Sequence, residues 1–122
     1  MQIEIVRNKI TRWGVDGEMF CQGRKVCDTA ENSFFALPTG FYWVRKARRG
    51  TIGVYNREGE LLAKISTGDG VVGLPDGRIV VGKALTLGVV IRSRTAYGLI
   101  YERCKKSWRR KHGIELFIRE EY

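Results

Sequence analysis

Cysteine, histidine and paired acids are the residue types here that could do chemistry, as a thiolate nucleophile, a metal site or an acid–base pair. The cysteines are Cys21, Cys27 and Cys104, and His112 is the only histidine. Three cysteines without a C-x-x-C pair favour neither a zinc site nor a disulfide framework. We expect them to be small, partly buried apolar residues, and we expect no metal and no cofactor.

The acids near Cys27 do not predict a catalytic pair. Asp28 and Glu31 stand three positions apart on a predicted strand, so their side chains should face opposite ways. Asp28 is also next to Cys27, and neighbours on a strand point to opposite faces. His112 stands between Lys111 and Gly113, where a helix should end, so we expect it to be solvated.

Several motifs, in order along the chain, resemble a family of small bacterial and phage domains of unknown function. "CDTAE" at residues 27–31 is similar to the family's C-D-T-L-E element, and "LPTGFYWV" at residues 37–44 to its I-P-x-G-x-Y-x-V element. Arg92-Ser93-Arg94 resembles an N-S-R element that opens a helix. The resemblance covers most of the chain.

Two further elements of that family are similar to the pattern of L,D-transpeptidases, in which a cysteine thiolate attacks a peptidoglycan stem peptide beside a histidine. In this chain Ser66 of "ISTGDG" stands where the family has histidine, and Arg78 of "DGRIVVG" stands where it has cysteine. An arginine stays protonated and is neither a nucleophile nor a base. The resemblance therefore implies a degenerate site, with no catalytic residue, at Ser66, Asp69, Asp76 and Arg78.

Arg78 has two possible roles at that position. It could form a surface ion pair with Asp76 or Asp69, which stabilises a fold by about 0 to 1 kcal/mol. Alternatively, a surviving cleft could use its guanidinium fork to hold a carboxylate or phosphate.

Short apolar runs separated by turn residues must position these side chains. Asp16-Gly17 predicts a hairpin turn, Gly23 lies between two further runs, and Gly59 suits a tight loop. Ser93 is expected to cap a helix over residues 94–111, and "IELFIRE" predicts a final strand. The expected apolar stripe of this helix is Tyr97, Ile100, Tyr101, Cys104 and Trp108.

This order of elements predicts a single α+β domain over residues 1–122. We expect it to be β-rich, with a mainly antiparallel sheet or small barrel and one C-terminal amphipathic helix followed by a final strand. The predicted core consists of apolar residues from all of these runs: Ile5, Phe20, Val26, Tyr42, Val44, Ile65, Val80, Tyr97, Ile100, Cys104, Trp108 and Phe117.

The positive charge is concentrated in two stretches of a chain with a net charge of +9. Residues 93–113 hold seven basic and one acidic side chain, and residues 45–49 hold four basic ones. A face built from both would attract polyanions, unless it serves only solubility. The candidate polyanion-binding residues are Arg45, Lys46, Arg48, Arg49, Arg103, Lys106, Arg109 and Arg110.

Three functions are compatible with these observations. The first is a non-catalytic binding or structural module of phage type, and the second is a nucleic-acid-associated accessory protein that uses the basic helix. The third, a cell-wall enzyme with a rearranged site, is disfavoured because both dyad residues are replaced. An acidic polymer or an acidic protein surface is a further partner for the basic face. No apolar run is long enough for a membrane span and no signal peptide is visible, so we expect a cytoplasmic protein without membrane contact.

Overall fold

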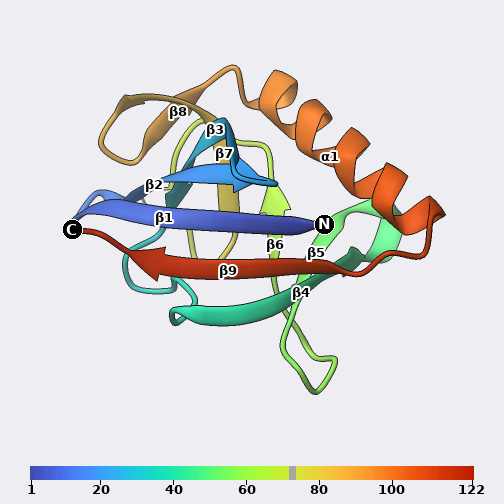
Figure 1. The fold of residues 1–122 in the computed structure, drawn as a ribbon. Coiled ribbons are helices and arrows are strands. Elements are labelled where there is room, and N and C mark those ends of the chain that lie inside the picture. The colour runs from blue at the N-terminus through green and yellow to red at the C-terminus, as the bar shows by residue number, and fades with distance from the viewer. Residues whose placement is uncertain (72–73) are drawn as a thin grey trace.

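A computed structural model describes residues 1–71 and 74–122, and nine strands and two helical segments make up its regular structure (Figure 1). The strands are β1 (Gln2–Thr11), β2 (Gly14–Cys21), β3 (Arg24–Glu31), β4 (Gly40–Lys46), β5 (Ile52–Tyr55), β6 (Leu61–Ser66), β7 (Ile79–Thr86), β8 (Val89–Ile91) and β9 (Ile114–Glu120). The helical segments are the short 3₁₀ turn η1 (Arg48–Gly50) and the helix α1 (Ser93–Arg109).

Eight of these strands close into a barrel. The strand order is β3-β2-β1-β9-β4-β5-β6-β7, and pairing of β3 with β7 closes the ring, while β8 pairs with β7 outside it. The β-rich barrel with one helix and a final strand is therefore as predicted. The sheet is mixed, however, because β1 pairs with β9 and β6 pairs with β7 in parallel.

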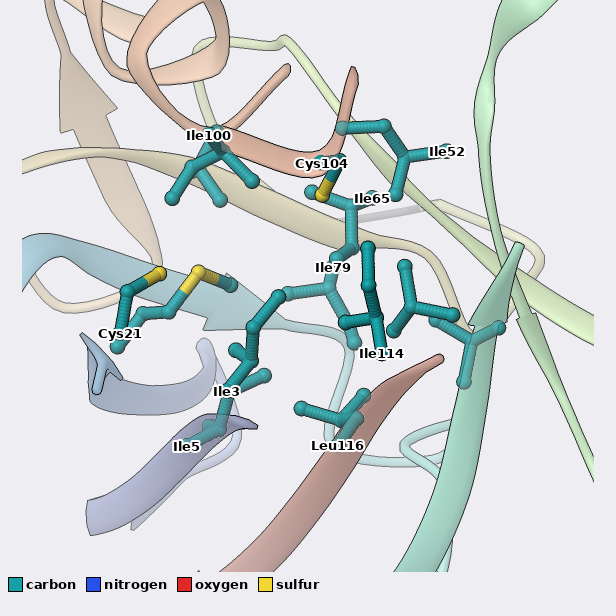
Figure 2. Packing of buried hydrophobic residues seen from close by; sticks show 14 of the residues in the cluster. Ile3, Ile5, Cys21, Ile52, Ile65, Ile79, Ile100, Cys104, Ile114 and Leu116 are labelled. Carbon is teal, nitrogen blue, oxygen red and sulfur yellow. The ribbon is translucent and has the colours of Figure 1, made fainter. Parts of the chain in front are cut away.

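The core fills the barrel and is closed at one end by α1 (Figure 2). Ile3 and Ile5 of β1 face Ile79 of β7 and Leu116 of β9, and all four are buried. Ile100 and Cys104 of α1 join this cluster from above. A second cluster, formed by Ala30, Val71, Val80 and Val90, packs separately, and its Val80 is buried as predicted.

Several predicted core residues are only half-buried, although Val26, Tyr97 and Trp108 still pack against the main cluster. Phe20, Val26 and Phe117 are only half-buried, whereas their neighbours Met19, Cys27 and Ile118 are buried. A shift of one residue moves a side chain to the other face of a strand, and runs such as Met19-Phe20-Cys21 are apolar at every position. Tyr97 and Trp108 are also half-buried, and they pack against the rim of the core.

The first hairpin and the helix start differ from expectation. Asp16 and Gly17 lie inside β2, and the turn falls at Arg12 and Trp13. Ser93 does not cap α1; its hydroxyl donates to the Val81 carbonyl at 2.5 Å and accepts from the Gly68 amide. The helix stops at Arg109.

The turns at Gly23 and Gly59 are confirmed. Gln22 and Gly23 both have positive φ, 50° and 81°, which two-residue hairpin turns of type I′ require. Gly59 has φ of 85°. In the described part of the chain, no helix is long and apolar enough to cross a membrane.

Candidate functional site

Three of the four residues of the predicted degenerate site lie around one hollow. Ser66 at the end of β6, with Asp76 and Arg78 in the turn before β7, lines one hollow of about 480 Å³. Asp69 does not line it; its side chain is exposed and its carbonyl accepts from the Val90 amide at 2.9 Å. The Ser66 hydroxyl is buried and has no hydrogen-bond partner among the described residues.

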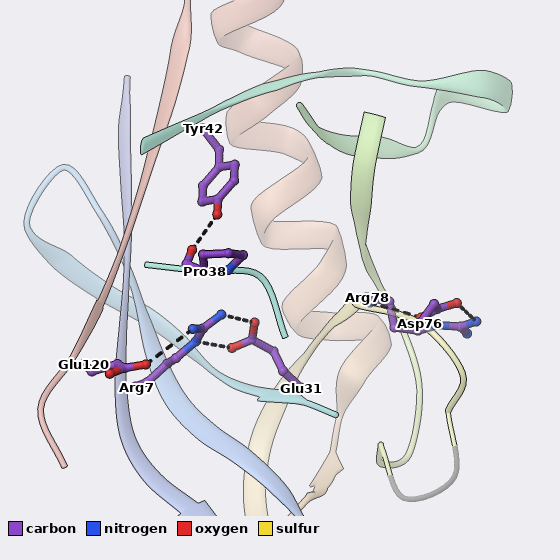
Figure 3. Close-up of polar contacts among 7 residues, drawn as sticks. All are labelled: Arg7, Glu31, Pro38, Tyr42, Asp76, Arg78 and Glu120. Carbon is purple, nitrogen blue, oxygen red and sulfur yellow. Dashed lines mark hydrogen bonds and ion pairs between the residues drawn. The ribbon is translucent and has the colours of Figure 1, made fainter. Parts of the chain in front are cut away.

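Arg78 forms a forked ion pair with Asp76 (Figure 3). Its Nε donates to Oδ1 at 2.8 Å and its terminal nitrogen to Oδ2 at 2.7 Å, while its backbone amide also donates to Oδ1. These bonds hold the pKa of Asp76 below its ordinary value and raise the pKa of Arg78. Asp76 thus occupies the Nε edge of the guanidinium, one of the two edges that could hold an external carboxylate or phosphate.

The thiols are buried rather than activated. Burial raises the pKa of Cys27 and of Cys104 to about 12, and it also raises the pKa of Cys21. His112 is exposed beyond the end of α1, where its carbonyl accepts from the Ser107 hydroxyl. Within residues 1–71 and 74–122, no cluster of three or more His, Cys, Asp or Glu side chains could hold a metal ion.

A buried ion pair inside the barrel is the main feature that the sequence reading missed (Figure 3). Arg7 of β1 donates from Nε and NH2 to the two carboxylate oxygens of Glu31 at 3.0 and 2.8 Å, and both side chains are buried. Burial tends to lower the pKa of Arg7, but the hydrogen bond and charge of Glu31 outweigh it and raise the pKa. Glu31 is the last residue of "CDTAE", so this element supplies a structural acid to the interior.

Gly17 makes room for that pair. It lies between Arg7 of β1 and Thr29 of β3 in the strand register. A Cβ added to Gly17 would come within 2.8 Å of the Thr29 hydroxyl and 3.3 Å of the Arg7 Cα. Gly17, which suggested a turn, therefore leaves the space without a side chain across which Arg7 reaches Glu31.

One basic stretch lies on α1 itself, and the other lies beside the C-terminal half of this helix. The Trp108 indole nitrogen of α1 donates to the Val44 carbonyl of β4 at 3.5 Å, so the turn after β4 is beside the C-terminal half of the helix (Figure 1). The end of β4 and that turn carry Arg45, Lys46, Arg48 and Arg49, which are all exposed. On the other flank, Arg103, Lys106 and Arg110 line a hollow of about 480 Å³ together with Gln22.

The charges of these stretches are not neutralised locally. Among the residues that the structure describes, no ion pair within 4.0 Å involves residues 45–49 or residues 93–111. Glu102 is the one acid in these two stretches. The helix end therefore presents a strongly positive surface, which we call the basic surface and define as Arg45, Lys46, Arg48, Arg49, Arg103, Lys106, Arg109 and Arg110.

Comparisons with protein-family models, curated proteins and solved structures find no significant match for this chain. The resemblance to the phage-type domains and to L,D-transpeptidases stays a prediction.

Proposed function

We propose that this protein is a non-catalytic module that binds a polyanion, with nucleic acid as the principal candidate. The observation that carries the proposal is the basic surface, whose cations come from two distant stretches, one on α1 and one beside it, and have no ion-pair partner within the described residues. Such a concentration of charge of one sign raises the local concentration of an anionic partner and speeds its association.

The occupied fork of Arg78 supports a non-catalytic role. Its partner Asp76 takes the Nε and one terminal nitrogen of the guanidinium, and the hydroxyl at Ser66 has no base beside it among the described contacts. The buried thiols have raised pKa values, so a thiolate nucleophile is disfavoured at neutral pH. We expect no transpeptidase turnover from the purified protein.

Salt dependence is the test of polyanion binding. Each neutralised duplex phosphate contributes about −0.9 to the slope of log affinity against log salt, so four or five contacts give a slope of about −4. Affinity for a fluorescent DNA duplex should be roughly micromolar or weaker at physiological salt and should not depend on sequence. Arg109→Gln with Arg110→Gln should flatten the slope by about two units.

A matched control carries the same loss of charge elsewhere. Lys9→Gln with Arg12→Gln changes two exposed cations near the β1–β2 turn, at the end of β1 away from α1 (Figure 1). This variant should keep the wild-type slope. If the wild-type protein passes a heparin or DNA column without delay at about 50 mM salt, the polyanion proposal is wrong and an acidic protein surface becomes the candidate partner.

A further inference from the structure

An aromatic row lies on the outer wall of the barrel and leads to the basic surface. Tyr42 and Val44 of β4 point into the core, so the alternate residues Phe41, Trp43 and Arg45 point outward. Across the strand pairs, Phe41 is opposite Phe117 of β9 and Trp43 is opposite Tyr55 of β5. Rings from three adjacent strands therefore share one outer face.

The rings in this row are ordered by their neighbours; Phe41 is exposed, and Trp43, Tyr55 and Phe117 are half-buried. The centroids of Phe41 and Phe117 are 4.7 Å apart with a tilt of 30°, and Phe41 is 52% exposed. Tyr55 lies over Gly53, where an added Cβ would come within 2.7 Å of a ring carbon of Tyr55. The Arg45 guanidinium stands 6.0 Å from the centre of the Tyr55 ring, so the row ends at the first cation of the basic surface.

A hollow accompanies the row. Phe41, Tyr42 and Trp43 line a pocket of about 410 Å³ together with Arg57 and Glu115. Small-molecule sites are typically hollows of this size, mostly apolar, with a few polar groups that fix orientation. Here the polar groups are one cation and one carboxylate, which can contact a phosphate and a base amino group respectively.

We propose that this aromatic row binds single-stranded nucleic acid, with bases stacked on Phe41 and Trp43. The phosphates of the same strand would contact Arg57 within the pocket and Arg45, Arg48 and Arg49 beyond it. This inference rests on the proposed function, because it identifies the polyanion that the basic surface attracts.

The combination of rings and cations selects this ligand. Single-strand binders pair a positively charged track for the backbone with aromatic side chains on which successive bases stack. A duplex keeps its bases stacked on one another, so a flat aromatic wall cannot reach their faces. An acidic polymer without rings would use the cations and leave Phe41 and Trp43 uncovered.

The experiment compares a labelled oligothymidine, the matched duplex and heparin by fluorescence anisotropy. Trp43→Ala should weaken oligothymidine binding roughly 5- to 100-fold, the range expected for loss of one stacked base, and should leave heparin binding unchanged. Trp43→Phe keeps a ring and should restore most of the affinity. The salt slope should stay at the wild-type value in both variants, because no phosphate contact is removed.

Trp13→Ala is the matched control. Trp13 is 44% exposed and has Arg12 stacked 4.5 Å from its ring centre, but it lies in the β1–β2 turn away from the basic surface. This variant should bind oligothymidine like the wild type. Thermal unfolding of each variant checks that the barrel is intact, and Phe41→Ala supplies a second ring deletion if Trp43→Ala does not fold.

The outcomes separate the two proposals. If duplex and heparin bind as tightly as oligothymidine and the ring deletions change nothing, the stacking site is wrong while polyanion binding survives. If none of the three ligands is bound, both proposals fail. Selective loss of single-strand affinity in Trp43→Ala, with the wild-type value in Trp13→Ala, supports the site.

Discussion

At the residue scale, the fold buries its three thiols. Cys21, Cys27 and Cys104 are 1%, 8% and 0% exposed, and burial raises the pKa of the latter two to about 12. With such a pKa, roughly one thiol in ten thousand is ionised at about pH 8. Iodoacetamide should therefore leave the native protein unlabelled at that pH, and labelling should begin only as the pH rises towards 12 or the chain unfolds.

The control for this labelling experiment is the protein in guanidinium chloride, where all three cysteines should react at the rate of a free thiol. Mass spectrometry counts the adducts. Fast modification of any one native cysteine at about pH 6 would contradict the prediction, because it would reveal an activated thiolate.

The Arg7–Glu31 pair leads to a second prediction at this scale. Glu31→Ala leaves the buried Arg7 with one carboxylate among the described residues, that of Glu120 at 3.9 Å, and should lower the free energy of unfolding by about 3 to 5 kcal/mol. The double variant Arg7→Met, Glu31→Leu should lower the free energy of unfolding by less than Glu31→Ala does, since it leaves no buried charge unpaired. Chemical denaturation measures both, and a loss below about 1 kcal/mol for Glu31→Ala would show that water reaches the pair.

Only the position of Arg7 in this pair could be predicted from the sequence. Ile3, Ile5 and Arg7 alternate on one strand, so the inward direction of Arg7 was readable from its apolar neighbours. Its partner was not readable, because Glu31 comes from β3, two strands away, and meets Arg7 only across Gly17. The Asp76–Arg78 pair was anticipated since its members are two residues apart and need only a turn.

At the element scale, local patterns identified the helix, most strands and the hairpins at Gly23 and Gly59, but not the pairing of strands distant in sequence. A run such as "IELFIRE" predicts a strand, yet nothing within it indicates that β9 inserts between β1 and β4, with β1 in parallel. Parallel pairing depends on how the barrel closes, which is a property of all eight strands. For the same reason the inward face of Met19-Phe20-Cys21 followed from the register with β1 and not from the run itself.

Gly98 provides a test of the helix as an element. It is exposed on α1, and a Cβ added there would meet nothing within 4 Å. Gly98→Ala should therefore stabilise the protein by about 1 kcal/mol, the difference in helix propensity between the two residues. Gly88→Ala is the contrasting variant, because it has φ of 72° and its Cβ would lie 2.2 Å from the Trp13 carbonyl oxygen. In thermal unfolding, the melting temperature of Gly98→Ala should lie above that of the wild type and that of Gly88→Ala below it. A lower melting temperature for Gly98→Ala would mean that α1 is not formed as described.

At the scale of the whole molecule, the barrel has three regions of different character. Its interior holds the apolar core and one ion pair, its outer wall over β4, β5 and β9 carries the aromatic row, and the end covered by α1 carries the basic surface. The sequence predicted the two basic stretches. It could not show that the second stretch lies beside the helix, because Trp108 and Val44, whose hydrogen bond joins α1 to β4, are 64 residues apart.

Crowding of cations at one end should make stability depend on salt. Like charges repel over about 10 Å at 0.1 M ionic strength and over only about 3 Å at 1 M. Arg48→Gln with Arg49→Gln removes two exposed cations, so at low salt it should raise the melting temperature by a few degrees. At about 1 M salt the difference should disappear, because the repulsion it relieves is already screened.

The control variant Lys9→Gln, Arg12→Gln removes the same amount of charge near the β1–β2 turn and should shift the melting temperature by less. Heparin, if it binds, should raise the melting temperature of the wild type more than that of the Arg48→Gln, Arg49→Gln variant, since ligands that bind only the folded state stabilise it by mass action. Equal melting temperatures for the wild type and this variant at every salt concentration would mean that the cations stand too far apart to interact. A melting temperature of the variant below that of the wild type would instead assign Arg48 or Arg49 a stabilising contact.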